Sequence, residues 1–145
     1  MTELDPQALA EAVGERMLAH DPASRELGMR IVSIDPGRCT MTMVGEPRML
    51  NGFSICHGGY LTLLADSAFA FACNSYNELT VAAGVTVDFL APAHLAEELT
   101  AAAVEVSRSG RTGLYDVTVT NPRGETVAVL RGRSHALKGR QTVPL

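Results

Sequence analysis

Apolar residues recur at helical spacing in two stretches of the chain. In the first stretch Leu9, Val13 and Met17 repeat every four residues, which predicts a short amphipathic helix within residues 1–20. Asp5-Pro6 provides an N-cap followed by proline at the first helical position, and the helix is expected to end before Asp21-Pro22.

The second stretch predicts a helix over about 58–76 that is apolar on most sides. Its apolar positions are Leu61, Leu63, Leu64, Ala65, Ala68, Phe69, Ala70, Phe71 and Ala72. A helix without a polar face is predicted to be buried. Phe69, Phe71 and the nearby Tyr60 are therefore expected to be core residues rather than ligand contacts.

The remaining segments have the composition and turn spacing of strands. Strands are predicted over 30–35, 38–44, 81–90, 99–108, 112–120 and 125–136, separated by turns that contain glycine or proline. Residues 45–55 are expected to be irregular and residues 141–145 to form a loose tail.

This order of elements predicts a single α+β domain over residues 1–145. Two strands, a buried helix and four further strands favour an antiparallel sheet wrapped around a long central helix. One sheet layer cannot cover a helix on every side, so a second copy of the chain is expected to cover the remaining face.

Composition limits the cellular compartment and the kinds of binding partner that the protein is expected to have. The net charge of −4 argues against nucleic acid as the main partner. Residues 101–145 are nevertheless basic, which suits a phosphorylated small molecule, although ordinary solvated strand faces explain it equally well. The three cysteines (Cys39, Cys56 and Cys73), the absence of a secretory signal and the shortness of the apolar run favour a cytoplasmic protein without a membrane partner.

Asp66 is the only residue with a fixed charge between Arg48 and Glu78. Carboxylates are rarely buried without a partner, because an isolated buried charge is strongly disfavoured. Asp66 therefore either receives hydrogen bonds from serine or backbone donors or takes part in a reaction.

The sequence around Asp66 resembles a known family. CHGGYLTLLADSAFAFACNS, with MLNG before it (49–52) and VDFLAPA after it (87–93), is similar to the hotdog-fold acyl-CoA thioesterases, in the phenylacetate-degradation (PaaI-type) branch. The resemblance covers about 27–135. It implies hydrolysis of aryl-acetyl-CoA thioesters, such as phenylacetyl- or hydroxyphenylacetyl-CoA, to the free acid and CoA. It also implies two composite sites per homodimer and a homotetramer. No metal or redox cofactor is indicated by the sequence.

Gly58 and Gly59 are placed at the start of the buried helix. Free N–H groups and the positive end of the helix dipole can polarise a thioester carbonyl there, and glycine allows a close approach. The alternative is a glycine turn needed only for helix entry.

The spacing of Gly58 and Asp66 predicts a site between two chains. Eight residues at about 1.5 Å of rise each place them about 12 Å apart along one helix. A base and an oxyanion donor must both lie within about 3 Å of their reacting atoms. Gly58 of one copy is therefore expected to face Asp66 of another, and a monomer should be inactive.

Other residues near the glycines have two interpretations each. Asn51 is expected to orient the water or the Asp66 carboxylate, but Asn-Gly is also a common turn pair. His57 either binds the thioester oxygen or steadies the loop by a backbone hydrogen bond. A Cys56–His57 dyad is disfavoured, because adjacent side chains usually diverge.

The chain departs from its apparent relatives in one respect. Some of them place a serine or threonine early in the strand after the helix, where it assists the acid. Residues 81–84 are VAAG here, which leaves only Thr80 and Thr86 nearby.

Coenzyme A carries phosphates that require basic side chains near the mouth of the site. The candidates are Arg108, Arg111, Arg131 and Arg133, although a solvated sheet face would also account for them.

Two other functions remain open. A hydratase or dehydratase acting on enoyl or 3-hydroxyacyl thioesters would use His57 and an acid. A non-catalytic acyl-CoA-binding protein would need the pocket and the phosphate contacts, but it would not need a carboxylate such as Asp66.

Overall fold

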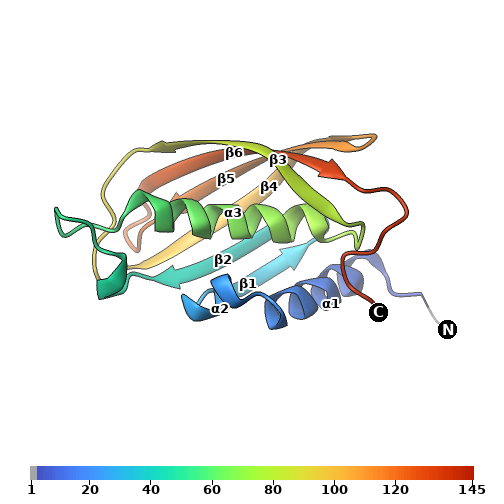
Figure 1. Ribbon diagram of the computed structural model, residues 1–145, viewed down its shortest axis with the longest axis horizontal. Helices are drawn as coiled ribbons and strands as arrows, with labels where there is room; N and C mark the ends of the chain where they lie inside the picture. Colours follow the sequence, from blue (N-terminus) through green and yellow to red (C-terminus); the bar gives the residue numbers. More distant parts are fainter. Residues whose placement is uncertain (1–2) are drawn as a thin grey trace.

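A six-stranded antiparallel sheet curves around one long helix in residues 3–145, the part of the chain that this computed structural model describes (Figure 1). The helix is α3 (Gly58–Asn74). The strands are β1 (Arg30–Asp35), β2 (Arg38–Val44), β3 (Thr80–Phe89), β4 (Glu98–Ser109), β5 (Thr112–Thr120) and β6 (Thr126–Ala136), in the order β1-β2-β4-β5-β6-β3. The predicted α+β architecture is confirmed, and three of the six strands match the predicted bounds.

The inner face of the sheet and α3 together form the core. Buried side chains of β2, β4, β5 and β6 pack against Leu64, Phe69 and Phe71 of the helix, so these two phenylalanines are core residues as predicted. The Phe69 ring lies so close to Gly132 of β6 that a Cβ there would be 2.7 Å from it, which explains why β6 has glycine at this position.

Two short helices precede the sheet. Helix α1 (Pro6–Ala19) begins as predicted, because Asp5 Oδ1 accepts the N–H of Ala8 at 2.7 Å. Helix α2 (Pro22–Glu26) was not predicted, nor was the short 3-10 helix at Pro47–Met49. Asp21 caps α2 by accepting the N–H of Ser24 at 3.0 Å, so Asp21-Pro22 begins a second helix as well as ending the first.

These helices cover one flank of α3, part of the surface expected to need a second copy. Ala10 and Val13 of α1 are buried, and the hydroxyls of Ser24 and Ser67 lie 3.0 Å apart between α2 and α3. The flank of α3 that stays partly exposed carries Gly59, Thr62, Asp66 and Ala70.

The C-terminal segment is hydrogen-bonded to the rest of the fold. The segment 141–145, expected to be loose, is tethered: Thr142 donates to Asn74 Oδ1 at 2.7 Å, and the N–H of Val143 donates to Asn77 Oδ1 at 3.0 Å. Residues 1 and 2 of the predicted N-terminal segment lie outside the described residues.

Strand β3 forms one edge of the sheet and is exposed over most of its length. Its apolar side chains Val81, Val85 and Phe89 are 45%, 40% and 55% exposed. A long apolar edge strand with unpaired backbone groups readily pairs with another chain.

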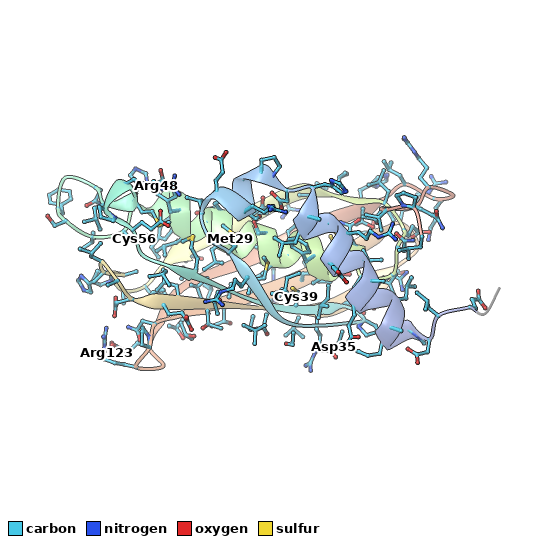
Figure 2. All side chains as sticks on the ribbon, turned by 90° about the horizontal axis from the view of Figure 1, so that it is seen from below. Met29, Asp35, Cys39, Arg48, Cys56 and Arg123 are labelled. Carbon is cyan, nitrogen blue, oxygen red and sulfur yellow. The ribbon has the colours of Figure 1, made fainter. Side chains whose placement is uncertain are left out.

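Within residues 3–145 no helix is long and apolar enough to span a membrane. All three cysteines are free and buried, and Figure 2 shows Cys39 and Cys56 well apart along the molecule.

Candidate active site

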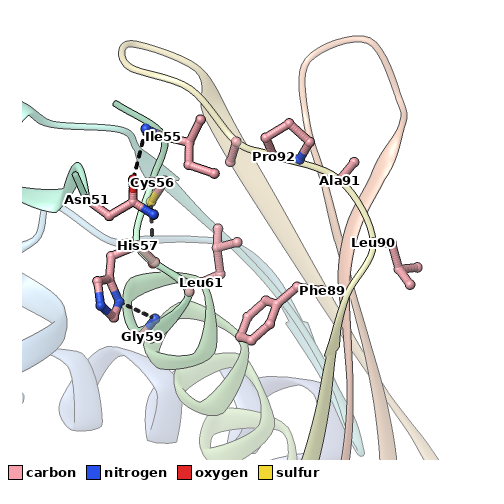
Figure 3. A pocket seen from close by; sticks show the side chains of 12 residues that line it. Asn51, Ile55, Cys56, His57, Gly59, Leu61, Phe89, Leu90, Ala91 and Pro92 are labelled. Atoms are coloured by element: carbon pink, nitrogen blue, oxygen red, sulfur yellow. Dashed lines mark hydrogen bonds between the residues drawn. The ribbon is translucent and has the colours of Figure 1, made fainter. Parts of the chain in front are cut away.

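A pocket of about 660 Å³ opens at the N-terminal end of α3, between the helix start and the segment that follows β3 (Figure 3). Its walls are formed by Asn51, Ile55, Cys56, His57, Gly58, Gly59, Leu61 and residues 89–93. Two backbone hydrogen bonds fix the helix entry: Cys56 N–H donates to Ala93 O at 2.8 Å, and His57 N–H donates to Met49 O at 2.7 Å. The pocket therefore has one rigid polar corner in a largely apolar lining.

The first turn of α3 leaves one backbone donor without a partner. His57 is the N-cap, and its Nδ1 accepts the N–H of Gly59 at 3.0 Å. Thr62 Oγ1 donates to Gly58 O at 2.8 Å, so both ends of the Gly58–Gly59 peptide are fixed. No hydrogen-bond partner within residues 3–145 takes the N–H of Gly58. Gly58, and not Gly59, is thus the N–H available to a ligand.

The hydrogen bond from Gly59 fixes the orientation of the His57 ring. Because Nδ1 accepts a hydrogen bond, the neutral imidazole carries its proton on Nε2. The exposed ring steadies the helix start, which is the structural role considered for it from the sequence.

Gly58 is in contact with the ring of Phe89. A Cβ at position 58 would lie 2.8–3.2 Å from three atoms of that ring. Glycine at this position therefore allows Phe89, from the end of β3, to lie against the helix start.

Asn51 organises the loop at the rim of the pocket. Its Oδ1 accepts the N–H of Phe53 at 2.9 Å and that of Ile55 at 3.4 Å, while its own N–H donates to Ile55 O at 2.8 Å. The turn role considered for Asn51 is thus present. Its side-chain NH₂ makes no hydrogen bond within residues 3–145 and remains available as a donor at the pocket.

Asp66 lies two turns further along α3, on the partly exposed flank. Burial raises the pKa of its carboxyl above the ordinary value. No donor or cation within residues 3–145 contacts this carboxylate, and the adjacent Ser67 pairs with Ser24 instead. Asp66 does not line the pocket of its own chain.

The two threonines considered as assistants to the acid do not serve Asp66 within the chain. Thr80 lies at the far end of α3, where its N–H donates to Asn74 Oδ1 at 3.0 Å and its hydroxyl donates to Glu78 O at 2.8 Å. Thr86 lies with Asp116 and Arg131 in a groove on the outer face of the sheet.

Two residues at the site were not singled out in the sequence. Thr62 lies four residues after Gly58 and four before Asp66, a spacing that could have identified it. Phe89 is part of VDFLAPA, but only the fold shows that its ring reaches Gly58.

No cysteine within residues 3–145 is hydrogen-bonded to a histidine side chain that could activate it as a nucleophile. Cys56 Sγ is directed at the backbone oxygen of His57 at 3.9 Å, not at the imidazole. Burial raises the pKa values of the Cys39 and Cys73 thiols to about 12, with smaller contributions from Asp35 and Asp66 respectively. Within the described residues, no group of three His, Cys, Asp or Glu side chains is placed to hold a metal ion.

The four arginines lie away from the pocket of their own chain. Arg131 is paired with Asp116 through two contacts of 2.7 Å, which hold the pKa of that carboxyl below its ordinary value. Arg108 stacks on the Tyr76 ring, 3.6 Å from its centre. Arg111 and Arg133 form no ion pair within residues 3–145.

Known proteins are similar to this chain in sequence and in fold. Residues 53–128 match the thioesterase superfamily. The acyl-coenzyme A thioesterase PaaI of Escherichia coli (strain K12) is 43% identical over 123 residues, which is 85% of this chain and 88% of that protein.

Solved structures agree with the sequence match. The structure of the E. coli PaaI protein from the phenylacetic acid degradation operon superposes with a TM-score of 0.92 at 40% identity, covering 94% of this chain and 99% of that one. A Streptococcus mutans UA159 protein bound to acetyl-CoA superposes with a TM-score of 0.75 at 25% identity, covering 78% of this chain and 91% of that one.

Proposed function

Because the chain belongs to the thioesterase superfamily, as an acyl-CoA thioesterase of the PaaI type with a hotdog fold, we propose that its substrates are aryl-acetyl thioesters of CoA. Phenylacetyl-CoA and hydroxyphenylacetyl-CoA would be hydrolysed to the free acid and CoA. The apolar lining of the pocket, which includes Ile55, Leu61, Phe89 and Pro92, is compatible with an aryl group.

One observation carries the proposal: α3 has a free N–H at Gly58 and an unpartnered carboxylate at Asp66. The thioester oxygen accepts the N–H of Gly58, at the positive end of the helix dipole, which favours the negative charge of the tetrahedral intermediate. The NH₂ of Asn51 orients the water or the carboxylate.

Asp66 acts either as general base or as nucleophile. As a base it takes a proton from water while the water oxygen bonds to the acyl carbon. The C–S bond then breaks, and the proton passes from Asp66 to the CoA thiolate. As a nucleophile its carboxylate attacks the acyl carbon, the C–S bond breaks, and the CoA thiolate leaves and takes a proton from water. Water then hydrolyses the mixed anhydride to the free acid and regenerates the Asp66 carboxylate.

The reacting groups come from two copies of the chain in a homodimer. Strand β3, at the exposed edge of the sheet, runs beside α3 (Figure 1). A second copy related by a two-fold axis would cover this edge together with the partly exposed flank of α3. The axis must pass midway between the levels of Gly58 and Asp66, which is about 6 Å from Gly58. The Phe89 ring contacts Gly58, so Phe89 lies beside Gly58 along the helix axis. A strand rises about 3.3 Å per residue, so a point about 6 Å from Phe89 toward Thr80 lies about two residues earlier, near Val87.

The same axis brings basic residues to the site. In one chain Arg133 pairs with Gly84 in the middle of β3, and Arg111 lies near the Thr80 end, because its carbonyl accepts the N–H of Ala136, which pairs with Thr80. A two-fold axis reverses the direction of β3, so Arg111 and Arg133 of the partner subunit lie beyond the Gly58 end, where CoA phosphates would be held. Two such dimers form a homotetramer, and each active site lies within one dimer.

Two other functions are less well supported. A hydratase would use His57 as an acid or base, but Nδ1 accepts the N–H of Gly59, which leaves only Nε2 on the exposed ring for that role. A non-catalytic binder has no use for a carboxylate whose pKa is raised by burial and that lacks a partner.

The test is thiol release from a panel of aryl- and alkyl-CoA thioesters by the wild type and by Asp66→Asn, with folding and dimerisation verified. We expect turnover of aryl-acetyl-CoA by the wild type and a fall in kcat of several orders of magnitude in the variant, which still binds substrate. Near-normal turnover by Asp66→Asn would refute the catalytic assignment, and binding of the panel by the wild type without hydrolysis would favour the binder.

A further inference from the structure

Phe89 is an exposed aromatic side chain held at a fixed place beside the free N–H of Gly58. It is 55% exposed although its ring lines the pocket and packs on Gly58. Figure 3 shows the ring directed from the end of β3 toward the helix start, whereas the neighbouring Leu90 points away from it. The far edge of the ring (Cε1, Cζ and Cε2) therefore lies against Gly58, while the ring also lines the pocket.

No other phenylalanine or tyrosine lines the pocket among the described residues. The remaining apolar walls come from aliphatic side chains, and the His57 ring is held at the helix cap by Gly59. Phe53 is 86% exposed, but it lies on the rim loop and outside the lining. The chain that supplies Gly58 thus offers one phenylalanine ring to an aryl group in this pocket.

The distances suit an aryl-acetyl group. When the thioester oxygen accepts the Gly58 N–H, at about 2.9 Å from the nitrogen, the acyl carbon lies next to the helix start. Only one methylene separates that carbon from the aryl ring, so the ring of the substrate stays beside Gly58, where the Phe89 ring already lies. Two aromatic rings placed this close together can adopt the offset or edge-to-face arrangements, with centroids about 4.5–7 Å apart, that such pairs prefer.

We propose that Phe89 determines the acyl specificity of this enzyme by packing its ring against the aryl ring of the bound thioester. The inference rests on the proposed function, because it assumes that the thioester oxygen binds at Gly58. A flat ring packed on Gly58 favours an aryl ring over a saturated acyl group of similar size.

The test compares two substrates of similar size, phenylacetyl-CoA and cyclohexylacetyl-CoA, by thiol release. The variants are Phe89→Leu, which keeps an apolar side chain, and Phe89→Tyr, which keeps the ring. Phe53→Leu is the matched control, since it makes the same substitution at an exposed phenylalanine outside the pocket. Melting temperature and dimerisation are measured for each variant.

We expect the ratio of kcat/KM for phenylacetyl-CoA to that for cyclohexylacetyl-CoA to fall about two- to twelvefold in Phe89→Leu, the range for one aromatic pair. The ratio should stay near the wild-type value in Phe89→Tyr and in Phe53→Leu. An unchanged ratio in Phe89→Leu, or an equal fall in Phe53→Leu, would overturn the inference while wild-type turnover of phenylacetyl-CoA upheld the proposed function. If the wild type hydrolysed no aryl-acetyl-CoA, the proposed substrate would itself be wrong, and the inference with it.

Discussion

Gly58 and Asp66 lie on the same helix, about 12 Å apart along its axis, and neither the N–H of Gly58 nor the carboxylate of Asp66 has a partner within residues 3–145. A donor and a base at this separation cannot both reach one thioester carbonyl. When a second α3 packs in the opposite direction, Gly58 of one chain and Asp66 of the other can reach the same thioester carbonyl. The separation therefore connects the chemistry of the site to its assembly.

Asp66 should make the folded protein less stable at neutral pH. Its pKa is raised in the folded state, so the fold binds the proton more tightly than the unfolded chain and disfavours the ionised carboxylate. Asp66→Asn is expected to raise the free energy of unfolding at pH 7 by about 0.5–2 kcal/mol. The gain should shrink as the pH falls through the raised pKa and vanish below the ordinary aspartate value.

Urea unfolding of both proteins at several pH values measures this difference. A variant less stable than the wild type at pH 7 would show that Asp66 has a stabilising partner in the assembled protein.

Gly58→Pro should remove the oxyanion donor without breaking the helix. Position 58 is the first helical residue, where proline is tolerated, and His57 has the extended backbone (ψ 134°) that a following proline requires. We expect kcat to fall about 10²–10³-fold.

Gly58→Ala is the matched control, since it adds the same Cβ against Phe89 but keeps the N–H. Steady-state kinetics of the two variants separate the effects. Equal losses in both would mean that the ring contact, and not the N–H, limits turnover.

The sequence predicts the elements that carry these residues, but not all of the contacts that the residues make. The order of elements was predictable because each has a strong local signal, as in the strands Arg30–Asp35 and Thr112–Thr120. Helix α2 has only five residues, too few to show a helical repeat, so Asp21-Pro22 is its one sequence signal, of the same form as Asp5-Pro6 at the start of α1.

The contacts within the site could not be derived from spacing. Whether His57 Nδ1 faces a ligand or Gly59 depends on the side-chain rotamer, which the sequence does not specify. Phe89 reaches Gly58 only because β3 runs back along α3, a long-range consequence of the topology. The outward direction of Thr86 likewise follows from the alternation of side chains across β3.

Asn51 should have two separable roles. Asn51→Asp keeps an oxygen that can accept the N–H of Phe53 but removes the NH₂ donor, whereas Asn51→Ala removes both. We expect Asn51→Asp to fold normally with kcat lowered about 10–150-fold, as for the loss of one hydrogen bond to a charged group of about 1.5–3 kcal/mol. Asn51→Ala should in addition lose about 1 kcal/mol of stability with the turn. Kinetics and thermal unfolding provide the two readouts, and wild-type kcat in Asn51→Asp would reduce Asn51 to a loop residue.

Arg111 and Arg133 should recognise the phosphates of CoA. Arg111→Ala and Arg133→Ala are expected to raise KM for an acyl-CoA about two- to fivefold, as for exposed charge pairs. KM for the corresponding acyl-pantetheine thioester, which has no phosphate, should not change. Arg131→Ala is the control, because Asp116 already neutralises Arg131. A rise confined to Arg131→Ala would move the phosphate site to the groove lined by Thr86, Asp116 and Arg131.

The composite site is tested most directly by mixing two inactive variants, Gly58→Pro and Asp66→Asn, and refolding them together. In a mixed dimer, Gly58 of one subunit and Asp66 of the other are both intact at one of the two sites. Half of the dimers should be mixed, so we expect about a quarter of the wild-type activity to return. A mixture no more active than the two variants measured separately would contradict the account, because it would place both groups of each site in a single chain.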